Sequence, residues 1–170
     1  GLTNEIWEPQ LDFFKKYSTI SYDILGHGKS NLEKKDISFD DFSYQLINLI
    51  DELKINKIHL VGFSIGSLIA RNFATKFNNR LKSLILLGSI YKRTEQQQKI
   101  VSDRYDQAKQ ELKLSKQALK RWFTDEYLEK NPNTYEKISS ILSANNMQNF
   151  LKVYELFVYH KNDEKFDEIK

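Results

Sequence analysis

Ser64 is the residue whose type and neighbours most clearly predict chemistry in this chain. It lies at the centre of the G-F-S-I-G segment 62–66, between an apolar run over 58–61 and an amphipathic stretch over 65–77. A G-x-S-x-G between a strand and a helix is typical of a serine on a tight, strained turn that exposes its hydroxyl for nucleophilic attack. The N–H of Ile65 begins the helix and can donate a hydrogen bond to an oxyanion. The motif therefore predicts Ser64 as a nucleophile and the Ile65 N–H as an oxyanion donor.

The two glycines of the motif have a structural role in this prediction. Because Gly62 and Gly66 have no side chain, we expect both of them to let the strand and the helix pass close together. We expect the resulting turn to lift the Ser64 hydroxyl above the sheet.

A nucleophilic serine also needs a histidine base and a carboxylate, and the chain has three histidines. His27 lies in a glycine loop and is not assigned as the base. His59 lies inside the strand before Ser64 and is interpreted as a core residue, whereas His160 lies among charges and is interpreted as solvated. The order serine, acid, histidine would also allow an acid at position 95, 103 or 106 to act with Ser64 and His160. We do not assign the triad to these acids, because they are not expected at strand ends.

The composition excludes several other kinds of site. The chain has no cysteine, which excludes disulfides, thiol catalysis and cysteine-ligated metal. Its 26 basic and 23 acidic residues give a net charge of +3, and the basic residues are scattered, so we expect no nucleic-acid partner. No metal-ligand spacing appears. No apolar stretch approaches the ~18 residues of a membrane span and no signal peptide is visible, so we expect a cytoplasmic protein without a membrane partner.

The first ninety residues alternate between apolar runs and helical periodicities, which is typical of an α/β fold. Such alternation favours a mostly parallel sheet with helical crossovers. Ser38 and Asp41 have the spacing of a capping box before one of the helices. The expected strands are 17–24, 57–63 and 83–88, the last of them buried on both faces, and the expected helices are 39–54 and 65–77.

The character of the chain changes after residue 90. Residues 93–170 are rich in lysine, glutamine and asparagine and contain no convincing strand. Asn131-Pro132-Asn133 is the clearest break between their helical patterns. These patterns lie near 96–113, 115–130, 134–142 and 146–160. We therefore predict a sheet domain over 1–90, a helical cap over 91–165 and the start of a return to the core over 166–170.

Four segments, in order, resemble the α/β-hydrolase fold superfamily, and the resemblance covers nearly the whole chain. Ser67 departs from it, because the family usually has another glycine there. The resemblance implies a partial α/β-hydrolase fold with a helical cap, and a structural role for His27, because the family has a structural histidine in this loop. It also implies a serine hydrolase that acts on a small-molecule carboxylic ester or lactone and needs no cofactor. The matching segments are W-E-P-Q at 7–10, Y-D-I-L-G-H-G-K-S at 22–30, L-V-G-F-S-I-G-S at 60–67 and R-L-K-S-L-I-L-L at 80–87.

Two further likenesses bear on the site. The L-K-R-W-F-T segment 119–124 is similar to the R-W-F segment of 3-oxoadipate enol-lactonases, which implies that Trp122 and Phe123 shape an acyl pocket. Taken singly, each of these aromatic residues fits the core of the cap better than it fits a pocket wall. Gly1 resembles the glycine of the family's H-G dipeptide, which implies that the Leu2 N–H is the second oxyanion donor.

The family's acid and histidine follow its cap, so the resemblance implies that both lie outside these 170 residues. We expect the chain alone to be inactive and poorly soluble, because its elbow strand would expose unpaired backbone groups along one edge. Two alternatives stay open. One is a C–C bond hydrolase or a cofactor-free haloperoxidase on the same fold, and the other is a non-catalytic binding module derived from a hydrolase. The sequence does not predict the oligomeric state.

Overall fold

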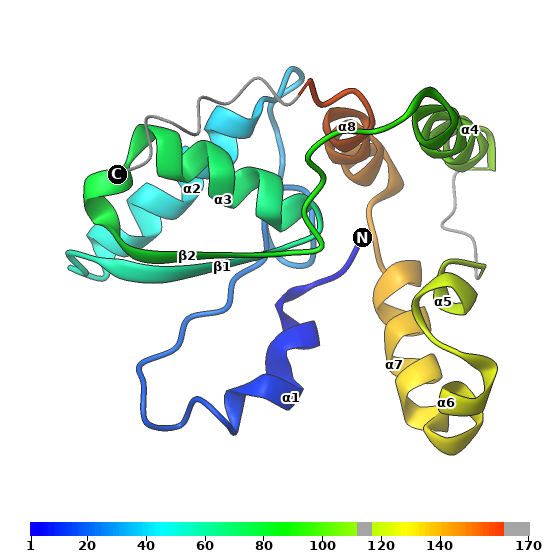
Figure 1. Ribbon diagram of the computed structural model, residues 1–170, viewed down its shortest axis with the longest axis horizontal. Helices are drawn as coiled ribbons and strands as arrows, with labels where there is room; N and C mark the ends of the chain where they lie inside the picture. The colour runs from blue at the N-terminus through cyan, green and yellow to red at the C-terminus, as the bar shows by residue number, and fades with distance from the viewer. Residues whose placement is uncertain (112–116, 162–170) are drawn as a thin grey trace. The chain divides into compact units, whose positions relative to one another are not determined.

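The computed structural model describes residues 1–111 and 117–161, and the chain divides into two units. Unit 1 comprises residues 1–33 and 103–154. Unit 2 comprises residues 34–102 together with the segment that begins at Glu155. Figure 1 carries the element labels used below.

Unit 2 is built on two parallel strands, β1 and β2, as the sequence predicts. Their register runs from His59 opposite Ser83 to Phe63 opposite Leu87. Among the described residues β2 is the only strand that pairs with β1, so the other edge of β1 has no described partner. The elements of unit 2 are α2 (Phe39–Glu52), β1 (Ile58–Phe63), α3 (Ile65–Lys76), the 3-10 helix η2 (Asn78–Arg80), β2 (Leu81–Leu87) and the first part of α4 (Glu95–Glu111).

The core of unit 2 lies between α2, α3 and one face of the strands (Figure 1). The apolar stripe of each helix faces this core, as the helical spacing predicts. Burial of these side chains is the main source of stability for the unit. The buried apolar residues are Phe42, Leu46, Ile47 and Ile50 of α2 and Leu68, Ile69, Ala70, Phe73 and Ala74 of α3.

The opposite face of the strands is exposed, which corrects two predictions. Ile85 and Leu87 of β2 are 44% and 42% exposed, so β2 is not buried on both faces. His59 of β1 is also exposed, and its Nδ1 lies 2.7 Å from the Ser83 hydroxyl, so it is not a core residue. Both corrections have one cause, because α2 and α3 cover only one face and side chains of a strand alternate between faces.

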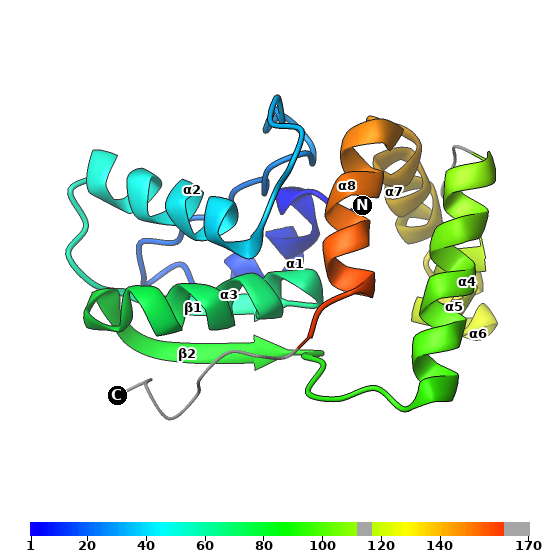
Figure 2. The same cartoon turned by 90° about the horizontal axis from the view of Figure 1, so that it is seen from above.

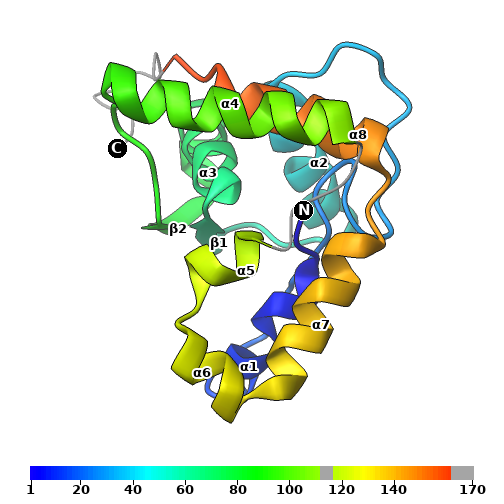
Figure 3. The same ribbon diagram turned by 90° about the vertical axis from the view of Figure 1, so that its right-hand side faces the viewer.

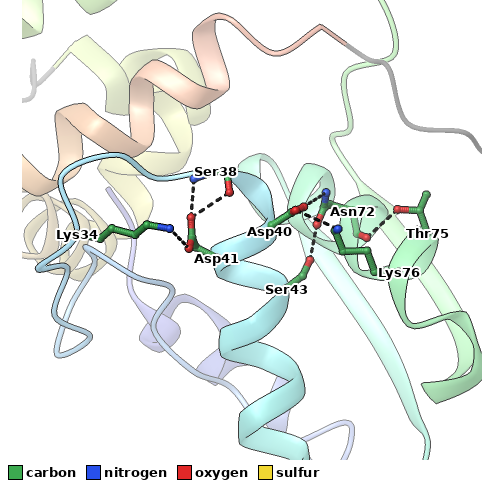
Figure 4. A network of polar contacts seen from close by, with 8 residues as sticks. All are labelled: Lys34, Ser38, Asp40, Asp41, Ser43, Asn72, Thr75 and Lys76. Atoms are coloured by element: carbon green, nitrogen blue, oxygen red, sulfur yellow. Dashed lines mark hydrogen bonds and ion pairs between the residues drawn. The ribbon is translucent and has the colours of Figure 1, made fainter.

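Polar contacts hold α2 to α3 and fix its start (Figure 4). The predicted capping box is present, since Asp41 accepts hydrogen bonds from the Ser38 N–H at 2.8 Å and hydroxyl at 3.0 Å. Burial acts to raise the pKa of Asp41, but hydrogen bonds from Lys34 and Ser38 outweigh it and leave that pKa below its usual value. On the facing side, Asn72 of α3 accepts from Ser43 at 2.6 Å and donates to Asp40 at 3.0 Å.

Unit 1 contains short helices and long connections. Figure 3 shows α6 and α7 side by side. The predicted helix over 115–130 is interrupted before α6, where the Thr124 hydroxyl caps the new helix by accepting from the Tyr127 N–H. Pro132 begins α7, which agrees with the predicted break. The elements are η1 (Asn4–Trp7), α1 (Glu8–Leu11), α5 (Gln117–Trp122), α6 (Asp125–Lys130), α7 (Pro132–Ser143), the end of α4 and most of α8 (Met147–Val158).

The predicted strand over 17–24 is wrong. These residues form no strand, and no other described strand belongs to unit 1. A β-strand is defined by hydrogen bonds to a neighbour, so β-branched and aromatic residues alone do not create one. The division of the chain at residue 90 into core and cap stays a prediction, and the predicted return to the core over 166–170 lies outside the described residues.

His27 is buried in unit 1, in agreement with a structural role. It is 3% exposed and packs edge-to-face on Phe150, with ring centroids 6.0 Å apart. Its Nδ1 lies 3.4 Å from the Leu25 carbonyl. Burial lowers the pKa of His27 to about 3. The neutral imidazole is therefore the form that the fold contains.

This buried histidine predicts acid sensitivity. Because the pKa of His27 is lower in the folded state than the ~6.5 of an unfolded chain, the unfolded state binds the proton more tightly between pH 6.5 and 3. The contribution of His27 to the free energy of unfolding should be fully present above pH 6.5. As the pH falls from 6.5 towards 3, the free energy of unfolding should decrease by at most about 1.4 kcal/mol per pH unit. In urea unfolding at pH 7 and pH 5, His27→Gln should lose less stability between the two values than the wild type. Equal losses would contradict this account.

Candidate active site

Ser64 occupies a strained backbone position between β1 and α3. Its φ is 54° and its ψ is −120°, and it is one of two residues other than glycine with positive φ among those described. A side chain in such a region costs about 1–3 kcal/mol, and this strain persists only where the surroundings hold it. Strain of this kind is concentrated at functional sites, which makes Ser64 the candidate centre.

Backbone contacts on both sides of Ser64 hold this conformation. Its N–H donates to the Leu87 carbonyl of β2 at 2.9 Å, which extends the strand pairing by one residue. Its carbonyl accepts from the Ser67 N–H at 2.9 Å and from the Ser67 hydroxyl at 2.6 Å. The residue is thus fixed to the sheet through its N–H and to the first turn of α3 through its carbonyl.

The two glycines of the motif are not equivalent, which corrects the prediction that both allow a close approach. A Cβ on Gly62 would lie 2.7 Å from the carbonyl carbon of Gly66 and 2.8 Å from the Cα of Ser67. These are backbone atoms, so no change of rotamer could relieve the overlap. A Cβ on Gly66 would meet no described heavy atom within 4 Å. Gly62 alone therefore makes room for the turn.

The hydroxyl of Ser64 is available for reaction within the described part of the chain. It forms no hydrogen bond to a described residue, and its own helix is not capped by it. The N–H of Ile65 is the first of α3, and the first N–H groups of a helix have no acceptor within that helix. Acyl transfer needs a nucleophile that attacks the substrate carbonyl carbon and a donor that stabilises the carbonyl oxygen. The Ser64 hydroxyl and the Ile65 N–H, at the positive end of a helix, are groups of these two kinds.

Sequence reasoning did not assign a role to two residues of α3 near this site. Ser67 is fully buried and supplies the hydroxyl that holds the Ser64 carbonyl. Arg71, 1% exposed, donates to the Ile90 carbonyl beyond the end of β2 at 2.6 Å. The helical spacing could have predicted that both residues are buried, because they lie four residues apart on the face of α3 that also contains the buried Ala74. Polar residues at such spacing on a buried face must have partners.

Three predicted site residues lie in unit 1, whereas Ser64 and Ile65 lie in unit 2. Leu2 is half-buried near the start of unit 1. Trp122 ends α5 and is 47% exposed, while Phe123 stacks on Tyr127 with centroids 5.4 Å apart. Ser64 and Ile65 are consecutive residues at the junction of β1 and α3, and the roles of all five residues stay predictions.

No histidine bonds to Ser64 within the described residues. His59 precedes Ser64 by five positions on an extended strand, or about 16 Å, too far for a base that must come within about 3 Å. His160 lies in unit 2 and packs edge-to-face on Phe39, with centroids 5.2 Å apart. His27 belongs to unit 1.

The described residues contain neither a cluster that could hold a metal ion nor a helix that could span a membrane. No group of three or more histidine, aspartate or glutamate side chains in 1–111 and 117–161 is arranged to hold a metal ion. Among the helices that the structure describes, none combines the length and the apolar character needed to cross a membrane.

Residues 3–137 match the family model of the alpha/beta hydrolase fold. The chain belongs to this family. Its curated relatives include an (E)-2-((N-methylformamido)methylene)succinate hydrolase from Acinetobacter baylyi, 32% identical over 92% of the chain. A 3-oxoadipate enol-lactonase of the same organism is 27% identical over 91% of the chain. The chain spans 59% and 58% of the lengths of these two proteins.

A solved structure of the same fold is the enol-lactonase from Burkholderia xenovorans, with a TM-score of 0.85 and 22% identity. The match covers 99% of this chain and 65% of that one. At this level of identity the likeness shows the fold. The partial α/β-hydrolase fold predicted from the sequence is therefore confirmed.

The difference between the two glycines can be tested directly. Gly62→Ala forces a Cβ into the backbone of residues 66 and 67 and should destabilise unit 2 by about 3 kcal/mol. Gly66→Ala is the matched control, and it should leave stability unchanged or raise it by up to about 1 kcal/mol through helix propensity. Urea unfolding of the two variants provides the comparison. Equal destabilisation by both variants would contradict the conclusion that Gly62 alone makes room for the turn.

The Ser67 hydroxyl should contribute to the same turn. Ser67→Ala removes its hydrogen bond to the Ser64 carbonyl and should cost about 1 kcal/mol in the free energy of unfolding. Ser89→Ala, at an exposed position after β2, is the control and should change stability by less than about 0.5 kcal/mol. If the two variants unfold at the same urea concentration, the Ser67 contact does not hold the elbow.

Proposed function

We propose that the full-length protein is a serine hydrolase of carboxylic esters or lactones that forms an acyl-enzyme on Ser64. The observation that carries this proposal is the strained, positive-φ serine between β1 and α3, with an unbonded hydroxyl beside the first N–H of a helix. Strain without function would be a net cost of about 1–3 kcal/mol, which a turn with ordinary backbone dihedral angles at Ser64 would avoid. The names of two relatives, a hydrolase and an enol-lactonase, support the reaction class.

In the proposed reaction, the Ser64 Oγ attacks the substrate carbonyl while a histidine removes its proton. The Ile65 N–H, and the Leu2 N–H as a second donor, stabilise the oxyanion of the tetrahedral intermediate. When the intermediate collapses, the bond to the leaving oxygen breaks and the histidine returns the proton to that oxygen, which departs as an alcohol from an ester or stays on the acyl chain of an opened lactone. Water, deprotonated by the same histidine, then attacks the acyl-enzyme and releases the acid and the Ser64 hydroxyl. Each oxyanion donor contributes about 3 kcal/mol of transition-state stabilisation in comparable enzymes. Trp122 and Phe123 would contact the acyl group, and the chemistry needs no cofactor.

The proposed base is a histidine outside these 170 residues, oriented by an acid that also lies outside them. His59 is too far along its strand, and His27 is buried beside Phe150 with a pKa of about 3. The relatives are longer than this chain, which leaves part of their length to supply both groups. We accordingly expect residues 1–170 alone to be inactive.

An active-site label tests the proposal. A fluorophosphonate should modify the full-length protein on Ser64, as located by mass spectrometry of the peptide, and Ser64→Ala should abolish the label. The same variant should reduce hydrolysis of a p-nitrophenyl ester or a simple lactone by about a thousandfold or more. Ser89→Ala is the control for a neutral change. A folded protein whose Ser64 stays unlabelled would favour a binding module derived from a hydrolase.

A further inference from the structure

The segment that follows β2 is fixed by two arginines of unit 2. Arg71 of α3 donates to the Ile90 carbonyl at 2.6 Å. Arg93 donates to the carbonyls of Phe157 and Val158 at the end of α8, both at 2.9 Å, and its guanidinium lies 4.8 Å from the centre of the Phe157 ring. A cation at this position satisfies carbonyl groups that the helix end leaves without partners. The segment 88–94 is thus held both to α3 and to α8.

A cavity of about 560 Å³ opens beside this segment, and all of its lining residues belong to unit 2. The volume falls within the range of small-molecule sites. Four cationic side chains line it, and Glu95 is the one acidic residue among those lining it that the structure describes. The cations are Lys92, Arg93, Lys99 and Lys161. Figure 2 shows the three parts of the chain that contribute: the connection from β2 to α4, the first part of α4, and the segment that leaves α8.

Three neutral acceptors in or beside the wall of this cavity are already occupied. The Ile90 carbonyl accepts from Arg71. The Gln98 Oε1 accepts from Arg93 at 3.2 Å, and the Val158 carbonyl, next to the lining, accepts from Gln98 at 3.0 Å as well as from Arg93. These oxygens are therefore not available to a ligand, and the Glu95 carboxylate is the one charged acceptor among the described lining residues.

The donors are in the opposite situation. The Thr94 hydroxyl accepts from the Gln97 N–H at 3.2 Å, and the Ser102 hydroxyl accepts from the Gln98 side chain at 3.3 Å. A hydroxyl that accepts a hydrogen bond keeps its own proton to donate. Lys92 and Lys161 are exposed and form no ion pair with any residue that the structure describes. The cavity thus presents ammonium and hydroxyl donors together.

We propose that this cavity binds a small organic anion through carboxylate or phosphate oxygens. Lys92 and Lys161 are the charged donors, and the hydroxyls of Thr94 and Ser102 are the neutral ones. Charge-assisted hydrogen bonds to anionic oxygens are the strongest that such donors form. The rigidly held segment 88–94 keeps Lys92 and Thr94 in place before the ligand arrives, which reduces the entropy lost on binding. The proposal does not depend on the reactivity of Ser64.

Calorimetric titration of the full-length protein with inorganic phosphate and, separately, with succinate tests this site. We expect saturable binding of at least one anion, weakened by added sodium chloride. Lys92→Gln and Lys161→Gln should each weaken it by about threefold, and the double variant by about tenfold. Lys57→Gln, an exposed lysine before β1, is the matched control and should have no effect.

The two arms identify the chemistry of the ligand. Binding of phosphate alone indicates a phosphorylated ligand, and binding of succinate indicates a carboxylate ligand. An unchanged rate of fluorophosphonate labelling of Ser64 at a saturating concentration of the bound anion separates this site from the proposed active site. Absence of saturable binding for both anions would overturn the proposal, and so would full binding by a folded Lys92→Gln/Lys161→Gln variant.

Discussion

The positive φ of Ser64 is the constraint on which the rest of unit 2 depends. β1 ends just before Ser64, α3 begins just after it, and β2 bonds to its N–H, so the backbone must change direction at this one residue. This change of direction requires the missing side chain of Gly62, the strand-like hydrogen bond to Leu87 and the Ser67 contacts with the Ser64 carbonyl. Because these contacts come from β1, β2 and α3, the packing of the whole unit holds one unfavourable pair of dihedral angles.

The sequence predicted most of this unit because its signals are local. The apolar run before Ser64, the periodicity after it and the spacing of Ser38 and Asp41 each specify structure within a few residues. The predictions that failed depend on neighbours distant in the chain. The run over 17–24 has strand composition but pairs with no strand in the part of the chain that the structure describes. His59 is exposed because no described element covers its face of the sheet.

The candidate site shows the same limit. Ser64 and Ile65 could be picked out from one motif. The role of Ser67 appears only in the folded turn, where its hydroxyl reaches the Ser64 carbonyl, and the roles of Arg71 and Arg93 appear only when the segments after β2 and at the end of α8 are placed in unit 2. A motif defines residue types but not which carbonyl a buried side chain reaches. The difference between Gly62 and Gly66 likewise comes from backbone atoms that lie close only in the folded turn.

A crystal structure of the full-length protein after reaction with a phosphonate inhibitor would show whether the strained Ser64 and the Ile65 N–H act on the same reacting group. We expect a phosphorus bonded to the Ser64 Oγ, a positive φ at Ser64, and a phosphonyl oxygen about 2.7–3.1 Å from the Ile65 nitrogen. A phosphonyl oxygen directed away from the start of α3, or a Ser64 with negative φ, would contradict this expectation.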